Sequence, residues 1–191
     1  MNILEMLKLP FSNNEIKSRQ SFNQKGKTLF YIDARCAMKR LDDVVGIDGW
    51  QDSYKSLEGR TVCELSLKIN GAWITKTDGA GDTNIEGEKG GLSDAFKRAA
   101  VKFGVGRYLY YVPNGVNTFD DLPPAFKPSN KRINREELQG SLIAIVNDIK
   151  EDSLSTAQES FNELELHEQM WVWNILSTNQ KDYIRSNQEA A

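Results

Sequence analysis

One segment of this 191-residue chain constrains its fold more than any other, because apolar and polar residues alternate along it and a tight-turn signal follows. A period of two over residues 61–69 predicts a β-strand with one buried face. Asn70-Gly71 then favours a two-residue hairpin, since both central positions of a type I′ turn need positive φ. We therefore expect strands over residues 50–56, 61–69 and 72–78. The apolar face of the middle strand would comprise Cys63, Leu65, Leu67 and Ile69.

Helical patterns lie on both sides of these strands. Asp33 suits the N-cap of a helix from Ala34 to about Val45, which Gly46 would end. A second helix is expected from about Gly91 to Phe103, with an apolar stripe on one side. The pattern of strands followed by a helix predicts an α+β fold with a β-β-β-α core.

The remaining N-terminal and connecting segments carry weaker signals. Residues 2–18 are expected to form a short helical entry, broken around Pro10. Residues 23–27 are polar and contain a glycine, which favours a turn, and residues 28–32 are a short apolar run. Residues 79–91, rich in Gly, Asp and Glu, are expected to form a loop.

Charge and proline content divide the chain into three expected parts. Residues 1–113 would form the core, residues 114–133 a proline-rich linker, and residues 134–191 a small acidic helical tail. The net charge is +4 over residues 1–133 and −7 over the tail, against −3 for the whole chain. This asymmetry is familiar in nucleic-acid-binding proteins, although a solvated tail of no special purpose gives the same charges. The tail helices are expected at about 135–149, 155–177 and 178–187.

Bulk composition excludes several classes of protein. Apolar residues make up 39% and charged residues 27%, which is typical of a globular chain. No run approaches the roughly 20 apolar residues of a membrane span, and no basic start with an apolar block marks a secretory signal. Cys36 and Cys63 are expected to be free thiols of an intracellular protein, with a bridge between them as the alternative.

Catalytic chemistry has little support in the sequence. The only histidine, His167, leaves no triad and no histidine metal site. The string GEKGGLSD lacks the spacing of a phosphate-binding loop, so ATP binding is not expected. We therefore predict no enzyme and no cofactor. A metal-dependent nuclease using the acidic loop 78–88 stays open as an alternative, with Asp78, Asp82, Glu86 and Glu88 as metal ligands.

Binding of a nucleic acid has more support. Lys97, Arg98 and Lys102 lie off the apolar stripe of the second predicted helix, and Arg107 follows it. Tyrosines come directly afterwards, at positions 108, 110 and 111. Cations neutralise phosphates and aromatic rings stack on bases, which suits a single strand. The alternative is a solvated basic helix face with the tyrosines in the core.

Two segments, YIDARCAMKRLDDVVGIDGWQDSY and EGEKGGLSDAFKRAAVKFGVGRYLY, resemble the Rad52/Rad22 single-strand annealing family in its bacteriophage-like form. The resemblance covers roughly residues 8–113. It implies a curled antiparallel sheet of three to four strands packed on a long helix. It also implies a homo-oligomeric ring that holds single-stranded DNA in a groove and anneals complementary strands without ATP. Such a protein would act in homologous recombination and double-strand break repair, in the cytoplasm of a bacterial host and for a phage.

The same resemblance assigns residues to the DNA. The groove floor of the family carries a Lys-Arg pair on the long helix, which matches Lys97 and Arg98 here, and a tyrosine that matches Tyr31. An arginine upstream of that tyrosine matches Arg19, and Arg60 matches a basic residue of a second, outer site. A further expectation concerns the acidic tail, which would recruit a single-strand-binding protein or an exonuclease.

Overall fold

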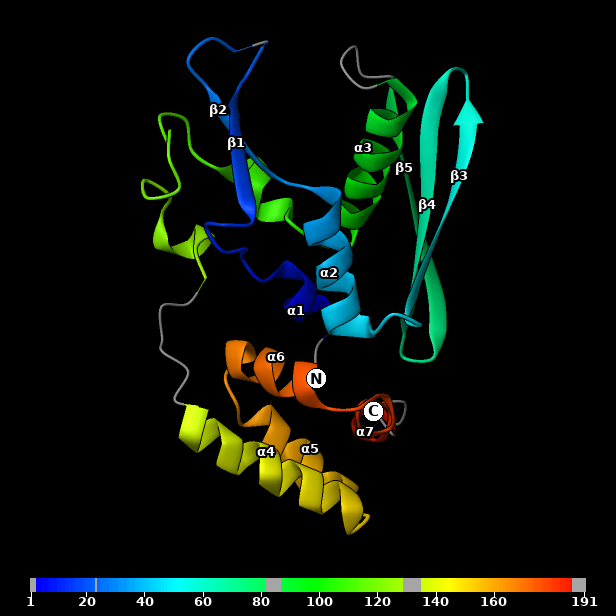
Figure 1. Ribbon diagram of the computed structural model, residues 1–191, viewed down its shortest axis with the longest axis vertical. Coiled ribbons are helices and arrows are strands. Elements are labelled where there is room, and N and C mark those ends of the chain that lie inside the picture. The colour runs from blue at the N-terminus through cyan, green and yellow to red at the C-terminus, as the bar shows by residue number, and fades with distance from the viewer. Residues whose placement is uncertain (1–2, 23, 82–86, 129–134, 187–191) are drawn as a thin grey trace.

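The computed structural model describes residues 3–22, 24–81, 87–128 and 135–186. It confirms the predicted α+β class, with two antiparallel sheets, helices packed on the larger sheet and small C-terminal helices (Figure 1). The described strands are β1 (Ile16–Gln20), β2 (Thr28–Ile32), β3 (Trp50–Leu57), β4 (Arg60–Ile69) and β5 (Ala72–Gly81). The described helices are α1 (Ile3–Lys8), α2 (Ala34–Val45), α3 (Gly87–Lys102), α4 (Arg135–Lys150), α5 (Leu154–Asn162), α6 (Leu166–Ile175) and α7 (Thr178–Arg185), with short 3-10 helices η1 (Arg107–Tyr111) and η2 (Pro124–Phe126).

The central strand of the larger sheet is β4, which pairs antiparallel with β3 on one side and β5 on the other. Its alternating apolar residues Cys63, Leu65 and Leu67 are fully buried, and α3 packs across β4 and β5. Burial of a leucine side chain contributes about 1.5–3 kcal/mol, so this face holds the sheet to the helix. Asn70 and Gly71 both have positive φ, 50° and 76°. The predicted strands and their turn are confirmed.

The helix predicted over residues 34–45 is confirmed at both ends. The Asp33 carboxylate accepts a hydrogen bond from the Cys36 N–H at 2.9 Å, which satisfies one of the donors left free at a helix N-terminus. Gly46 has a φ of 84° and donates its N–H to the Asp42 carbonyl. The helix buries Leu41, Val44 and other apolar side chains, and it places Asp33 beside the end of β2.

The N-terminal segment differs from the expected helical entry over residues 2–18. Helix α1 ends at Lys8, and residues 16–20 form β1, which pairs antiparallel with β2. Only the first residue of β1 is even partly buried, so no apolar periodicity marks this strand in the sequence. Its partner β2 is fixed in the core by three buried side chains, Thr28, Phe30 and Ile32. Residues 16–20 become a strand because they form backbone hydrogen bonds with this fixed partner.

Two helix boundaries also differ from the prediction. Helix α3 begins at Gly87, inside the expected loop 79–91. A glycine costs a helix only about 1 kcal/mol relative to alanine, and the packing of α3 on β4 and β5 outweighs that cost. The expected helix 155–177 is two helices, α5 and α6. The break spans residues 163–165, and Glu165 at its end is the N-cap of α6, where it forms a capping box with Glu168.

The tail helices pack against α2 at the end of the molecule away from the β1–β2 loop (Figure 1). Trp173 of α6 is fully buried, and its Nε1–H donates to the Val44 carbonyl at 3.0 Å. The preceding proline-rich segment also contacts the core through the buried Leu122 and through Phe126, whose ring lies 6.0 Å from that of Tyr108. None of the helices in the described ranges is long and apolar enough to span a membrane.

Candidate nucleic-acid interface

The β1–β2 hairpin brings two cations and a tyrosine onto one face. In the antiparallel register Lys17 lies opposite Tyr31, and Arg19 lies opposite Leu29. Directly opposed residues share a face, and positions two apart on one strand do as well. The Lys17 ammonium also pairs with the Asp33 carboxylate at 3.0 Å, which ties this face of the hairpin to the start of α2.

Lys97 of α3 reaches the same face. Its Nζ lies 5.8 Å from the centre of the Tyr31 ring, within the range of a cation–π contact. It also pairs with Asp94 one turn earlier, at 2.8 Å, and 25% of its side-chain surface is exposed. The opposite side of α3 is fixed in the core through Ala95, Phe96 and Ala99. Lys97 and Tyr31, far apart in the sequence, therefore form one cation–aromatic pair between hairpin and helix.

Arg98 and Lys102 contact β5 instead. Both pair with Asp78, Arg98 through Nε at 3.0 Å and Lys102 through Nζ at 3.4 Å. Lys102 also donates to the Thr77 carbonyl. Burial would raise the pKa of Asp78, but the Gly79 N–H, Arg98 and Lys102 together hold it below its ordinary value. Arg98 keeps 50% of its side-chain surface exposed, so the pairing leaves it accessible to a ligand.

The other predicted cations lie outside the Lys97–Tyr31 pair. Arg107 donates to the carbonyls of Val101 and Lys102, at 2.8 and 2.6 Å, and so caps the end of α3. Arg60 is exposed at the start of β4, beside the turn that joins β3 to β4. Arg19 lies on the hairpin, with its guanidinium carbon 5.6 Å from the centre of the Phe22 ring.

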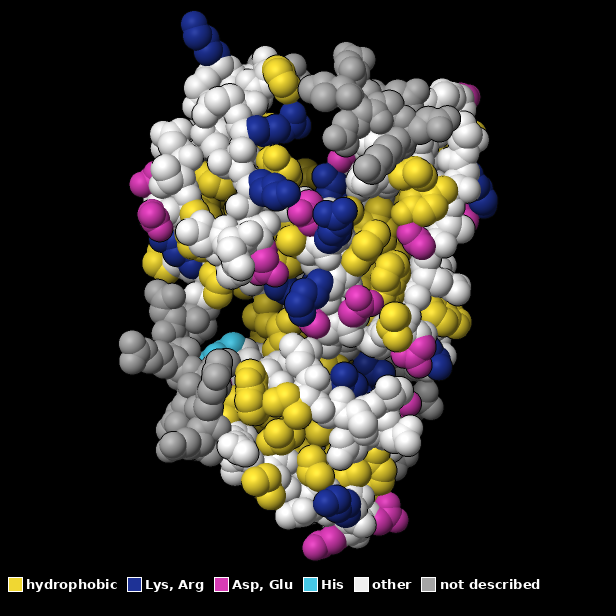
Figure 2. All heavy atoms as spheres, viewed as in Figure 1, with side chains coloured by type: hydrophobic (Ala, Val, Ile, Leu, Met, Phe, Trp, Pro, Cys, Tyr) yellow, Lys and Arg dark blue, Asp and Glu magenta, His cyan; other side chains and the backbone are white. Residues whose placement is uncertain are grey.

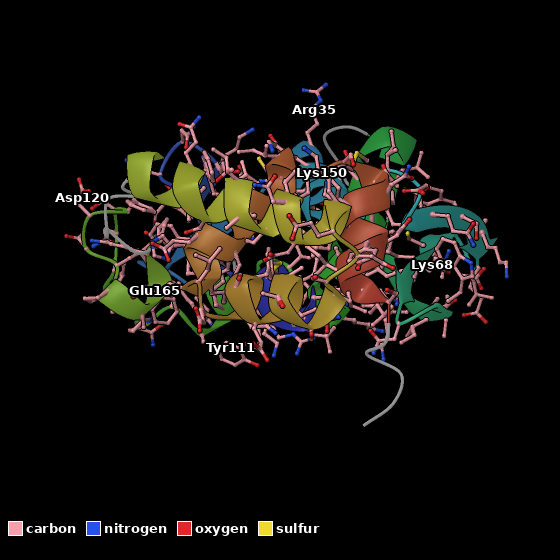
Figure 3. All side chains as sticks on the ribbon, turned by 90° about the horizontal axis from the view of Figure 1, so that it is seen from below. Arg35, Lys68, Tyr111, Asp120, Lys150 and Glu165 are labelled. Carbon is pink, nitrogen blue, oxygen red and sulfur yellow. The ribbon has the colours of Figure 1, made fainter. Side chains whose placement is uncertain are left out.

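The tyrosines that follow α3 have two different environments. The Tyr108 hydroxyl is partly buried and accepts a hydrogen bond from the Phe11 N–H at 2.8 Å, which is a structural role. Tyr110 and Tyr111 are exposed. Tyr111 points out of the face opposite to the one from which Arg35 projects (Figure 3).

Sequence reasoning missed Lys17 at this interface. The signal that could have found it is the spacing of Lys17 and Arg19, which share a face once residues 16–20 are read as a strand. Figure 2 shows Lys and Arg side chains gathered along the middle of one face, with Asp and Glu among them and a hollow beside the hairpin.

Candidate metal ligands do not gather in the described part of the chain. No group of three or more His, Cys, Asp or Glu side chains suited to a metal ion occurs there. Asp78 is held by two cations, while Asp82, Glu86 and Glu88 of the proposed nuclease site lie outside the described side chains. Cys36 and Cys63 are free, which confirms the expected thiols, and burial raises the pKa of Cys63 to about 11.

The fold and this surface define a class: a β-β-β-α protein with clustered cations and aromatic rings, the side chains typical of a nucleic-acid interface. The chain belongs to the Rad52/22 family of double-strand break repair proteins, whose model matches residues 1–118. The match spans both sheets, α2, α3 and η1, and it ends before the tail helices.

Two relatives from the genus Deinococcus share one name. The single-stranded DNA-binding protein DdrA of Deinococcus radiodurans is 29% identical over 147 residues, covering 69% of this chain and 70% of that protein. The protein of that name from Deinococcus deserti is 29% identical over 147 residues, covering 69% and 73%. Both matches extend over more than the β-β-β-α core alone.

Proposed function

We propose that this chain binds single-stranded DNA on the surface shared by the β1–β2 hairpin and α3. The observation that carries the proposal is the contact between Lys97 and Tyr31, which places a phosphate-binding cation beside a ring able to stack. Membership of a double-strand break repair family supports it, as does the likeness to two proteins described as single-stranded DNA-binding.

We further propose that the bound strand is annealed to its complement without ATP. Phosphates would lie on Lys17, Lys97 and Arg98, which lowers the repulsion between two backbones. Bases would stay available for pairing, and stacking in the new duplex releases about 1.4 kcal/mol per step. Pairing can then drive the reaction, and no side chain needs to act as an acid, base or nucleophile.

Assembly into a homo-oligomeric ring belongs to the same proposal. Within the described chain, β3 and β5 each have only β4 as a strand neighbour, so each offers an open edge to another subunit. A ring would repeat the Lys97–Tyr31 pair along one continuous strand. Measuring the assembled mass of the purified protein, with and without an oligonucleotide, tests this part of the proposal.

The tail supports a second role that is compatible with the first, the recruitment of another repair protein. A pocket of about 370 Å³ lies between α4, α5 and α6, and it combines apolar and acidic side chains. Its acidic lining residues are Glu163 and Glu168, in a tail of net charge −7. The complementary partner would be a basic, partly apolar segment. Loss of partner binding on Glu163→Lys, with DNA binding retained, would support it.

An annealing assay in EDTA and without nucleotide tests the main proposal. Complementary labelled oligonucleotides should form duplex faster with the protein than without it, and the double variant Lys97→Ala/Arg98→Ala should lose most of the acceleration. The loss of two phosphate contacts should also make binding less sensitive to salt. The slope of log K against log salt concentration should become shallower by roughly 0.7 for each lost contact. An unchanged double variant would contradict the assigned surface. Metal-dependent, EDTA-sensitive degradation of the strand would favour a nuclease instead.

A further inference from the structure

Phe22 lies at the base of the loop that joins β1 to β2, and the residue is 84% exposed. The loop is closed beside it by a hydrogen bond from the Ser21 N–H to the Lys27 carbonyl at 2.8 Å. The Ser21 hydroxyl also accepts from the Gln24 N–H at 3.2 Å. The backbone next to the ring is thus held in place while the ring itself is in solvent.

An exposed apolar side chain is common on protein surfaces and by itself indicates nothing. Two further observations set Phe22 apart. The guanidinium carbon of Arg19 lies 5.6 Å from its ring centre, which pairs the ring with a cation on the DNA-facing side of the hairpin. Residues 16–32 also hold four cations, Lys17, Arg19, Lys25 and Lys27, and no Asp or Glu.

This charge argues for one kind of partner. A segment of 17 residues with net charge +4 attracts a polyanion and repels a second copy of itself. An aromatic ring among cations matches the two halves of a nucleotide, because the cations take the phosphate and the ring takes the face of the base. Figure 2 shows hydrophobic and basic side chains side by side at this end of the molecule, next to the hollow in the surface.

We propose that Phe22 stacks on an unpaired base of the bound strand, with Arg19 holding the ring and contacting the adjoining phosphate. This inference rests on the proposed function and names the ligand of the hairpin loop: the exposed face of a nucleobase. In a duplex both faces of every internal base are covered by neighbours, so this contact favours single strands over double strands. The contact should not depend on the base sequence, because every base has a face on which a ring can stack.

Anisotropy measurements with two labelled probes of equal length test the proposal. One probe is oligo-dT, and the other is an abasic strand with the same phosphates. Phe22→Ala should weaken binding of oligo-dT at least about fivefold, since one stacked base contributes a factor of roughly five to 150. Binding of the abasic strand should stay within twofold, and the salt dependence should not change, because no ionic contact is lost.

Matched variants separate stacking from other effects. Phe22→Tyr keeps a ring and should bind oligo-dT like the parent, whereas Phe22→Leu keeps apolar bulk and should behave like Phe22→Ala. Ile47→Ala removes a side chain that is 83% exposed at a turn far from the hairpin in the sequence, and it should have no effect. In the parent, a 2-aminopurine base in the strand should lose fluorescence on binding, and Phe22→Ala should reduce that loss.

The outcomes distinguish this inference from the proposed function. A parent that binds neither probe overturns the proposed function itself. A parent that binds while Phe22→Ala binds oligo-dT equally well overturns only the stacking contact. Equal losses on both probes also overturn it, because the base is then not the ligand. A change in assembled mass that accounts for the lost affinity identifies Phe22 as a contact between subunits and overturns it as well.

Discussion

Lys97 and Arg98 are adjacent in the chain but interact with different parts of the fold. Successive helix residues differ by about 100° around the axis, so neighbouring side chains point to different elements. Lys97 lies over Tyr31 of β2, and Arg98 pairs with Asp78 of β5. The two cations are neighbours in the sequence, but each contacts a different strand, so their substitutions should have different effects.

Single variants should reveal this separation. We expect Lys97→Ala to weaken binding of single-stranded DNA and reduce its salt dependence, with little effect on folding. Arg98→Ala should also lower the free energy of unfolding by about 0.5–1 kcal/mol, because the Asp78 pair is partly exposed and its loss leaves Lys102 as the remaining cation. A double-mutant cycle in urea denaturation is the control: in an Asp78→Asn background, Arg98→Ala should cost less than it does in the parent, because the ion pair is already absent. Identical stability of all variants would contradict the pairing.

The charge of Asp33 should make folding pH-dependent at low pH. The Cys36 N–H and Lys17 lower the pKa of Asp33 from 3.8 to about 2 in the folded chain. A lowered folded pKa stabilises the protein above the unfolded pKa, and the contribution is lost as the pH falls from about 4 to 2. A third of the side chain is exposed, so we expect about 1 kcal/mol. Asp33→Asn should be less stable at pH 7, and the difference from the parent should shrink through pH 4 to 2 and vanish below about pH 2 in denaturant titrations.

At the scale of elements, the tail is attached to the core mainly through α6 and α2. The buried Trp173 donates to the Val44 carbonyl, and Arg185 of α7 donates to the same oxygen at 3.3 Å. The Arg185 guanidinium and the Lys181 ammonium both lie over the Trp173 indole, at 4.9 and 5.9 Å from a ring centre. Two of the four cations of the acidic tail are thus used at its contact with the core.

Trp173 variants measure how much this contact contributes. Trp173→Ala should cost about 3–5 kcal/mol, as expected for a fully buried aromatic side chain, and should make the tail more sensitive to protease. Trp173→Phe should cost less, because it removes the indole donor and some volume but keeps a ring against Phe161, 5.6 Å away. Limited proteolysis and thermal melts give the two readouts. Equal stability of Trp173→Ala and the parent would show that the tail is held elsewhere.

For the whole molecule, the attraction of a negatively charged strand depends on where the charges lie, and not only on the net charge of −3. The first 133 residues carry +4 and the tail carries −7. In the structure the tail packs on α2, at the end opposite to the β1–β2 loop (Figure 1). Its negative charge is therefore held away from the hairpin and acts on a bound strand only at a distance, where salt screens it.

Removal of the tail tests this arrangement. We propose that a chain ending at residue 133 stays folded, because the sheet, α2 and α3 share buried residues such as Leu41, Leu65 and Phe96. Its melting temperature should fall as the Trp173 contact is lost. Its affinity for single-stranded DNA should rise a few-fold at low salt and approach that of the parent near 0.5 M salt, where charges are screened beyond about 4–5 Å. Aggregation of the truncated chain would show that the tail is part of the folding unit.

Local patterns in the sequence determined much of the fold. The alternation over residues 61–69, the Asn70-Gly71 turn and the Asp33 cap each act between residues close in the chain, so they could be read without the structure. The family resemblance likewise picked out Tyr31 and Lys97. Strand β1, and with it the position of Lys17 opposite Tyr31, could not be predicted, because β1 buries almost nothing and becomes a strand only through its pairing with β2.

Tertiary structure alone decided which cation meets which partner. Lys97 contacts Tyr31, Arg98 and Lys102 hold Asp78, Arg107 caps α3, and Trp173 joins the tail to α2. These contacts link residues from separate elements, and the relative position of those elements follows from how their buried faces pack. Sequence periodicity states that a face is buried but not what it is buried against.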